Sequence, residues 1–345
     1  MHVLLTGCNG YIGCVLAPML QARGHVVVGL DTDYFKNSLF TGSLPEIETI
    51  SRDIRDISAS DVAGFDAVIH LAGLSNDPLG DYRPQLTEQI NAVAAVSLAR
   101  LARGAGVQRF LFASSCSNYG AAGNEFLDEN APFNPVTPYG VSKVAVEAEL
   151  HRLADADFSP TYLRASTAYG ASPLLRFDLV INNLTAWAFT TGRIYLKSDG
   201  NAWRPVVHVE DIARAYIAAL EAPREAVHDR AFNVGTSTEN YRVRELAELV
   251  GEIIPDCRIE FAPDAGPDQR CYRVDCNRIA LELHPFKPQW TARRGIEQLY
   301  EIYQRVGLTL EDFEGARFMR IAQIRKLVND GLLDQDLRWR EPMEA

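Results

Sequence analysis

Over the first 165 residues, short apolar runs alternate with longer stretches whose apolar residues recur every three or four positions. The short runs predict buried strands, and the longer stretches predict amphipathic helices. The predicted strands cover residues 2–5, 26–30, 67–72, 109–113 and 160–164, and the predicted helices cover residues 11–23, 85–103 and 139–153. This alternation indicates an α/β fold built on a doubly wound parallel sheet.

The alternation breaks after about residue 165. Residues 206–209 and 211–220 read as a strand and a helix that return to the sheet, between two stretches of mixed pattern, 167–203 and 237–290. The chain is therefore predicted to have three parts. The main domain takes residues 1–166 and 204–236, a smaller mixed α/β lobe takes residues 167–203 and 237–295, and a charged, helical C-terminal extension takes residues 296–345.

Charge and composition narrow the class of partner. The chain has 345 residues and a formal net charge of −11, which argues against nucleic acid or an acidic membrane as the main partner. No apolar run approaches the roughly 18 residues of a membrane span, and the N-terminus shows no basic region or cleavage site of a secretory signal. The six cysteines are scattered without a C-x-x-C pair, so we expect reduced thiols, a cytoplasmic protein and no metal site.

The first predicted strand runs into a glycine-rich turn that opens the first helix, with the sequence TGCNGYIG at residues 6–13. Gly7 permits a tight turn, Gly10 lets the backbone approach a pyrophosphate, and Gly13 lets helix and strand pack closely. The helix N-terminus adds unpaired N–H groups and the positive end of a dipole. The alternative is a plain glycine turn, but the flanking strands favour a dinucleotide site in a Rossmann-type sheet.

An acidic residue at the end of the second predicted strand bears on the cofactor. Asp31 follows Gly13 by 18 residues, and a carboxylate there can accept hydrogen bonds from the two hydroxyls of an adenosine ribose. It would repel a 2′-phosphate, so the sequence favours NAD over NADP. The alternative is an ordinary solvated aspartate in a loop.

Tyr139 and Lys143 are four residues apart and share one face of a predicted helix. A lysine ammonium stabilises a tyrosinate, so we expect the phenol pKa, normally about 10, to be lowered toward the working range. The tyrosine could then take a proton from a substrate hydroxyl while hydride leaves the same carbon. Ser115, just past a predicted strand, is placed to hydrogen-bond that hydroxyl.

These residues resemble the extended short-chain dehydrogenase/reductases, specifically the nucleotide-sugar epimerase/dehydratase group. The similarity covers roughly residues 1–290. It rests on Asp31, Asp53-Ile54, Asn91, Arg204 and the motifs TGCNGYIG at 6–13, HLAG at 70–73, SSCSNYG at 114–120, YGVSK at 139–143, LRASTAYG at 163–170 and HVED at 208–211. The resemblance implies a Rossmann-type doubly wound sheet with a smaller mixed α/β lobe for the substrate.

The resemblance also implies roles for individual residues. Asp53 and Ile54 would meet the adenine ring, Asn91 would support the active-site backbone, and Ser115, Tyr139 and Lys143 would be the catalytic triad. The implied NAD-binding residues are Gly7, Gly10, Tyr11, Ile12, Gly13, Asp31, Asp53, Ile54, Leu71, Ala72, Gly73, Asn91, Ser114, Tyr139 and Lys143.

The two residues after Ser115 bear on the branch of the family. The 4,6-dehydratases carry Asp and Glu there, whereas this chain has Cys116 and Ser117, which disfavours loss of water. Cys116 does not match the cysteine of 3,5-epimerases, and we expect it to be a buried apolar filler. A small hydroxyl residue at Ser117 fits enzymes of the UDP-galactose 4-epimerase type, which oxidise C4 transiently and consume no cofactor.

The substrate implied is a nucleotide-diphosphate sugar, whose phosphates an arginine fork suits. The implied substrate residues are Ser117, Thr167, Asn183, Arg204 and Arg270, with Arg273 as a competitor of Arg270. Phe177 and Trp187 could face the nucleobase or pack in the core. Thr167 stands where the family usually has Asn, Pro205 stands where it usually has Asp, and an insert at 76–81 borders the sugar, so a specialised sugar is expected.

Several functions stay open at this point. Besides a C4 epimerase, the chain could be an NAD(P)-dependent nucleotide-sugar 4-dehydrogenase or 4-ketoreductase with net cofactor turnover, an NAD-sensing scaffold, or a proton-abstracting epimerase without a redox step. The family resemblance further implies a homodimer, formed through the predicted helices at residues 85–103 and 139–153.

Overall fold

The computed structural model describes residues 1–75, 77–268 and 270–340, so Asn76 of the predicted insert and the last five residues of the predicted extension lie outside it. Seven parallel strands form the main sheet in the order β11-β7-β5-β4-β1-β2-β3. Their bounds are β1 His2–Thr6, β2 Val26–Asp31, β3 Glu48–Ser51, β4 Ala67–His70, β5 Arg109–Ser115, β7 Ser159–Ala165 and β11 Arg230–Val234. The predicted α/β class with a doubly wound parallel sheet is confirmed.

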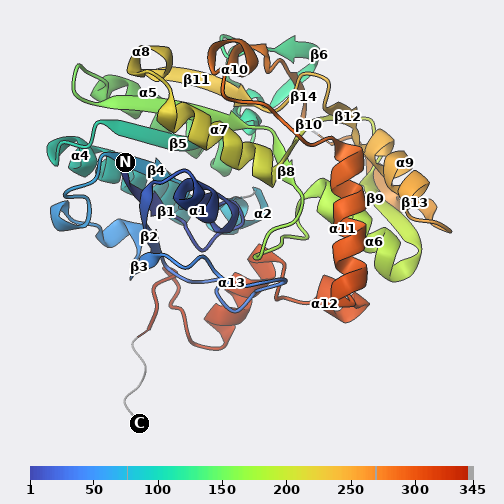
Figure 1. Cartoon of the computed structure of the whole chain (residues 1–345). Helices are drawn as coiled ribbons and strands as arrows, with labels where there is room; N and C mark the ends of the chain where they lie inside the picture. The colour runs from blue at the N-terminus through green and yellow to red at the C-terminus, as the bar shows by residue number, and fades with distance from the viewer. Residues whose placement is uncertain (76, 269, 341–345) are drawn as a thin grey trace.

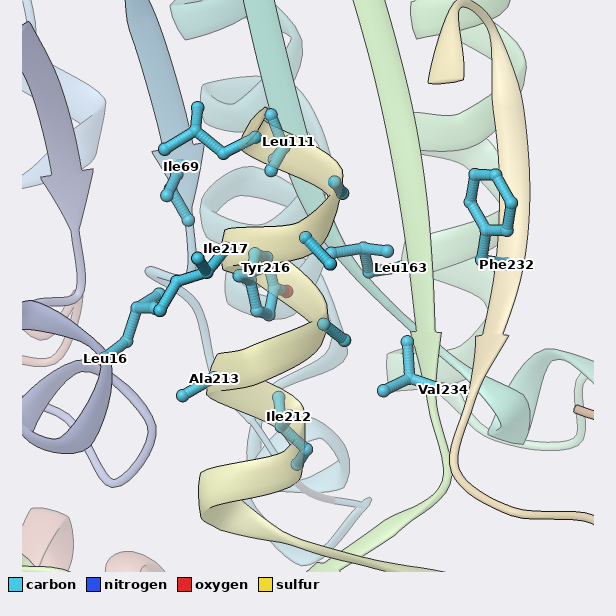
Figure 2. Close-up of a cluster of buried hydrophobic side chains, with 14 of the residues drawn as sticks. Leu16, Ile69, Leu111, Leu163, Ile212, Ala213, Tyr216, Ile217, Phe232 and Val234 are labelled. Carbon is cyan, nitrogen blue, oxygen red and sulfur yellow. The ribbon is translucent and has the colours of Figure 1, made fainter. Parts of the chain in front are cut away.

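Helices cover both faces of this sheet (Figure 1). On one face lie α1 (Gly13–Ala22) and α7 (Val209–Glu221), and on the other lie α4 (Ala94–Gly104) and α5 (Pro138–Leu153). Figure 2 shows how Ile212, Tyr216 and Ile217 of α7 meet side chains of the strands and of α1. Because the strand order reverses between β1 and β4, the loops at the carboxyl ends of these two strands diverge and leave a crevice for a ligand.

The predicted helix at residues 85–103 is one helical run with an irregularity. It consists of α3 (Pro84–Thr87), a π-helical turn η3 (Glu88–Val93) and α4. A π turn inserts one extra residue into a helix and often lies at a functional site. Apolar periodicity gives no sign of such an insertion, because the pattern resumes after it.

One predicted strand pairs differently from the expectation. Residues 206–209 were predicted to return to the main sheet, but β10 (Trp203–His208) joins a separate three-stranded sheet with β8 (Thr167–Tyr169) and β12 (Asn240–Arg242). Residues 206–209 therefore fall largely in a strand outside the main sheet. The chain returns to the main sheet through β11, which pairs in parallel with β7.

The remaining strands and helices lie outside the main sheet and its four covering helices. Two short parallel pairs join β13 (Arg258–Gly266) to β9 (Arg193–Ser198) and β14 (Cys271–Val274) to β6 (Ala121–Leu127). The other helices are α2 Asp77–Tyr82, α6 Val180–Thr191, α8 Arg224–Val227, α9 Val243–Ile253, α10 Asn277–Glu282, α11 Ala292–Val306, α12 Leu310–Glu314 and α13 Arg320–Asn329. The predicted part boundaries stay predictions. Across the described residues, no helix combines the length and apolar character needed to cross a bilayer.

Candidate active site

The glycine-rich turn lies between β1 and α1. Gly7 has φ of +75°, and a Cβ added there would lie 2.8 Å from the backbone nitrogen of Ala72. A Cβ at Gly13 would lie 2.3 Å from the carbonyl oxygen of Gly7, so both positions require glycine. Within the described part of the chain, no side chain caps the first turn of α1. The turn therefore presents backbone N–H groups to an anion.

A pocket opens over this turn at the carboxyl ends of β1, β2 and β4. Most of the predicted NAD-binding residues line it: Gly7, Gly10, Tyr11, Ile12, Gly13, Asp31, Asp53, Ile54, Leu71, Ala72 and Gly73. Its wall also contains Tyr34, Phe35, Ser75, Arg176 and Arg320, to which the sequence analysis gave no role. A pocket with a glycine turn and an acidic strand end fits a dinucleotide.

Asp31 holds its carboxylate in place through two backbone donors. The N–H groups of Asn9 and Asp33 donate to its two oxygens at 3.0 and 2.8 Å. Burial raises the pKa of Asp31 to about 6, although these hydrogen bonds oppose the rise. The group is therefore mostly ionised at neutral pH and can accept hydrogen bonds from a ribose. Asp53, at the far wall, is paired with Arg55 at 2.6 Å.

Asn91 and Ser114 lie behind the pocket rather than on its wall. Asn91, on the π-helical turn, accepts a hydrogen bond from the N–H of Leu74 at 2.7 Å and donates to its carbonyl at 3.0 Å. It thereby holds the backbone just after β4, as the resemblance implied. The Ser114 hydroxyl donates to Glu147 on α5 and accepts from Asn118 at 3.1 Å, so its side chain is engaged away from the pocket. The cofactor role of Ser114 stays a prediction.

The proposed triad meets where β5 ends and α5 begins. Thr137 caps α5 by accepting the N–H of Gly140 at 3.2 Å, which fixes Tyr139 in the first turn. The ammonium nitrogen of Lys143 lies 5.5 Å from the ring centre of Tyr139 and 4.8 Å from that of Phe112. Ser115 lies close enough to Tyr139 to lower the pKa of its phenol. The structure thus brings together the three residues that the sequence singled out.

The electrostatics of Tyr139 differ from the expectation. Burial raises the pKa of Tyr139 to about 12, while the nearby hydroxyl of Ser115 and the charge of Arg176 lower it in part. The expected phenol pKa near the working range is therefore wrong for the protein chain alone, because desolvation outweighs the stabilising groups. Burial also lowers the pKa of Lys143 to about 8, and the charge of Glu147 opposes that change.

The two residues after Ser115 have different surroundings. The Ser117 hydroxyl donates to the Ser115 oxygen at 2.8 Å, and the Ser117 N–H donates to it at 3.1 Å. Cys116 is fully buried, and its thiol donates to the carbonyl of Arg164 at 3.1 Å. Burial raises the pKa of the Cys116 thiol. The interpretation of Cys116 as a buried filler is confirmed.

The two predicted phosphate arginines lie together and share one carboxylate. Arg204 donates to Asp268 at 2.5 Å and also to the carbonyl of Arg270. Arg270 contacts the same carboxylate at 3.1 Å and reaches Asp77 of the insert at 2.5 Å. Asp77 in turn accepts a hydrogen bond from Thr137, the cap of α5, at 2.8 Å. These ion pairs link the arginine pair to the catalytic helix.

The other predicted substrate residues are held by local contacts. Asn183 on α6 donates to the carbonyl of Phe177 at 2.8 Å. Thr167 lies on β8 opposite Val206 of β10. Phe177 is fully buried among aromatic side chains, and Trp187 packs against Phe313, so both belong to the core of the lobe. The substrate roles of Ser117, Thr167, Asn183, Arg204 and Arg270 stay predictions.

Sequence reasoning missed the acidic partners of the arginine pair and two arginines of the cofactor pocket, Arg176 and Arg320. Asp268 stands two residues before Arg270, and such a close acid–base spacing in a loop was a usable signal. Arg176 lines the cofactor pocket, is paired with Asp178 at 2.7 Å and donates to Ser75 at 3.2 Å. Its charge also reaches Tyr139, so it connects the pocket with the triad. No local pattern marks Arg176 as functional.

Known proteins that are similar to this chain include several epimerases. The UDP-glucose 4-epimerase of Mycolicibacterium smegmatis is 29% identical over 317 residues, covering 88% of this chain and 99% of that protein. The human UDP-glucose 4-epimerase is 30% identical over 342 residues, covering 87% and 94%. The structure of MoeE5 in complex with UDP-glucose and NAD has a TM-score of 0.76 and 26% identity, covering 89% of this chain and all of that one. The UDP-glucose 4-epimerase of Thermotoga maritima, at 22% identity and a TM-score of 0.77, shares the fold.

A family model matches most of the chain. The model described as the NAD dependent epimerase/dehydratase family aligns with residues 3–235, which include the glycine turn, Asp31, the triad and Arg204. The resemblance to extended short-chain dehydrogenase/reductases is thereby confirmed, and the cofactor is NAD. This chain belongs to the NAD dependent epimerase/dehydratase family.

Proposed function

We propose that this chain is a nucleotide-sugar epimerase that acts by transient oxidation of the sugar at C4. The observation that carries the proposal is the proximity of Ser115 and Lys143 to Tyr139 where α5 begins. The similarity to proteins named UDP-glucose 4-epimerase supports the same reaction class. Bound NAD⁺ would supply the hydride acceptor and give the hydride back.

The residues of the triad would handle the proton. The Ser115 oxygen accepts two hydrogen bonds from Ser117, so its own proton is available to a phenolate or to a sugar oxygen. Tyr139 would take the proton of the C4 hydroxyl and return it when the 4-keto sugar is reduced on its other face. The ammonium of Lys143, whose pKa is about 8, would keep positive charge near the phenolate at neutral pH.

The arginine pair would hold the diphosphate while the keto sugar turns. A guanidinium suits phosphate oxygens because it offers a planar fork of donors. Arg204 is buried and held by Asp268, so it would contact the diphosphate from a fixed position. Arg270 is half-exposed, so its side chain could adjust to the diphosphate. Cys116 and Ser117 supply neither the acid nor the base that removal of water needs. This favours epimerisation over dehydration.

The proposal includes a homodimer formed by the helical run of residues 84–104 and by α5. Val93 and Val141, one on each of these segments, are exposed apolar side chains at 61% and 53%. A second copy would cover them through a four-helix contact. Light scattering of the purified protein should give twice the mass of the 38.3 kDa chain, and a monomer at micromolar concentration would contradict this part.

The test is proton NMR of the enzyme with a panel of UDP-, GDP-, CDP- and dTDP-sugars and only catalytic NAD⁺. We expect one member to give a new stereoisomer at C4 without accumulation of NADH. Tyr139→Phe is the matched control and should give no product. Conversion that consumes NAD(H) one-for-one would contradict the proposal and make the chain a 4-dehydrogenase or 4-ketoreductase.

A further inference from the structure

The C-terminal residues 316–340, here named the C-terminal strap, contain α13 (red in Figure 1) and contribute Arg320 to the lining of the cofactor pocket. At the start of the strap, Arg317 donates to the carbonyl of Leu39 at 2.8 Å. At its end, the indole N–H of Trp339 donates to the carbonyl of Thr32 at 2.6 Å, and Arg55 donates to the carbonyl of Asp336 at 2.7 Å. Both ends are thus fastened to loops that follow β2 and β3.

Between these fastenings the strap sends one guanidinium into the pocket. Arg320, the first residue of α13, is only 3% exposed and lines the pocket together with the glycine turn and Asp31. Its carbon Cζ lies 3.9 Å from the ring centre of Phe35, and its Nη2 donates to the carbonyl of Leu174 at 3.3 Å. Among residues 1–75, 77–268 and 270–340, its Nη1 is buried and has no hydrogen-bond partner.

The charge of Arg320 is compensated only at a distance, by the carboxylates of Asp178 and Asp31. Its neighbour Arg176 is paired with Asp178, whereas Arg320 forms no ion pair within the described ranges. Burial and the proximity of Arg176 lower the pKa of Arg320 to about 9. A buried charge without a partner is costly, and such groups are normally paired with an ion or a ligand. The nearby carboxylate of Asp31 is already held by the N–H groups of Asn9 and Asp33.

A pyrophosphate is the ligand group that would complete this arrangement. It carries two negative charges, and its expected place is against the glycine turn and the uncapped start of α1, in the same pocket. A guanidinium donates to phosphate oxygens with a strong, charge-assisted hydrogen bond.

We propose that Arg320 is a cofactor-binding residue whose Nη1 donates to the pyrophosphate of NAD, so that the C-terminal strap closes the cofactor into its pocket. Release of NAD then requires movement of the strap as well as loss of this contact. Such retention suits a reaction that returns its hydride in every turnover. The inference concerns the cofactor and does not depend on which sugar the enzyme uses.

The experiment compares ADP with adenosine by calorimetry on protein freed of nucleotide. Arg320→Gln should weaken the binding of ADP about 10- to 100-fold, because one hydrogen bond to a charged group is lost. The affinity for adenosine should stay within twofold. Arg320→Lys keeps the positive charge and should therefore lose less affinity for ADP than Arg320→Gln does. Lys326→Gln is the matched control on the same strap, since its exposed ammonium pairs with Asp330 and does not line the pocket, and it should leave ADP affinity within twofold.

Two results would overturn the proposal. Equal weakening of ADP and adenosine by Arg320→Gln would assign the residue a structural role, and no weakening of either would remove it from the site. If that variant does not fold, hydrogen exchange of the unmodified protein decides. Amides of α13 should be protected by ADP but not by adenosine, and equal protection would contradict the phosphate contact. Neither readout involves a sugar or turnover, so failure here is distinct from failure of the epimerase proposal.

Discussion

The molecule contains two arginine clusters to which we assign phosphate groups, and they differ in how their charges are paired. On the substrate side, Arg204 and Arg270 share Asp268, and Arg270 also binds Asp77. In the cofactor pocket, Arg320 has a buried Nη1 without a hydrogen-bond partner among the described residues. We therefore expect the nucleotide sugar to compete with ion pairs in the first cluster and NAD to supply a partner in the second. This contrast matches a substrate that leaves in each turnover and a cofactor that stays.

The largest effect should come from the residue between the two clusters. Tyr139→Phe removes the group that moves the proton, and we expect turnover to fall about 10³-fold, within the range of acid–base catalysis. Both phosphate clusters should survive, because the phenyl ring keeps the packing of α5. The measurement is the rate of sugar isomerisation together with ADP affinity. A loss of ADP binding in parallel with the rate would mean that the variant disturbs the pocket.

Arg204→Gln should separate the two clusters. Losing one charge-assisted contact to the diphosphate should raise KM for the nucleotide sugar about 10- to 100-fold. ADP affinity should stay unchanged, because Arg204 is absent from the lining of the cofactor pocket. Steady-state kinetics with calorimetry would test this. An equal loss of ADP affinity would show that the clusters are not independent.

The pH dependence of cofactor binding should report on Asp31. Its pKa of about 6 lies above the ordinary value of 3.8, so the carboxylate takes up a proton as the pH falls below 6. The protonated group loses acceptor capacity for the ribose, and affinity for ADP-ribose should fall by up to about tenfold per pH unit there. Calorimetry from pH 7.5 to 5 would show the change. Asp31→Asn has no group to titrate and should flatten the profile; a profile that persists in this variant would assign the titration elsewhere.

The sign of the effect on stability is opposite for the unliganded protein. A carboxylate whose folded pKa is raised costs stability while it is ionised, above pH 6, and this cost is relieved as the pH falls from 6 toward 3.8. Acid should therefore weaken ligand binding in a range where the contribution of Asp31 to folding improves.

The smallest effect is expected from removing the carboxylate that pairs with Arg204 and Arg270. Asp268→Asn removes the carboxylate that both substrate arginines share, which makes this cluster more like the cofactor pocket. We expect UDP to bind about threefold tighter at low salt, consistent with the modest strength of partly exposed ion pairs. Titration of UDP with and without added salt would measure it. Weaker binding would indicate that Asp268 mainly holds the arginines in position.

Most of the main sheet could be predicted, because the period of apolar residues and the position of glycine are local features. The turn at Gly7 and the pair Tyr139 and Lys143 are likewise encoded within a few residues. β10 was assigned to the wrong sheet, since an apolar run does not specify its partners. The π turn around Asn91 was also not predicted, because one inserted residue leaves the helical pattern of apolar residues recognisable.

Two of the missed contacts of the site join segments that are distant in sequence, whereas Asp268 lies only two residues before Arg270. Arg320 reaches the glycine turn from the C-terminal strap, and Asp77 meets Arg270 across the substrate side. Nothing in the neighbourhood of either residue indicates such a partner. The raised pKa of Tyr139 was not predicted for a similar reason, since it arises from burial by the folded chain.

The central claim is that hydride leaves C4 of the sugar and returns to the same molecule. It is tested most directly by mass spectrometry of product formed from a nucleotide sugar deuterated at C4, with catalytic NAD⁺ in ordinary water. We predict that the epimerised sugar keeps its deuterium. Loss of the label to water would indicate proton abstraction, and its transfer to added cofactor would indicate net oxidation; either result would contradict the account.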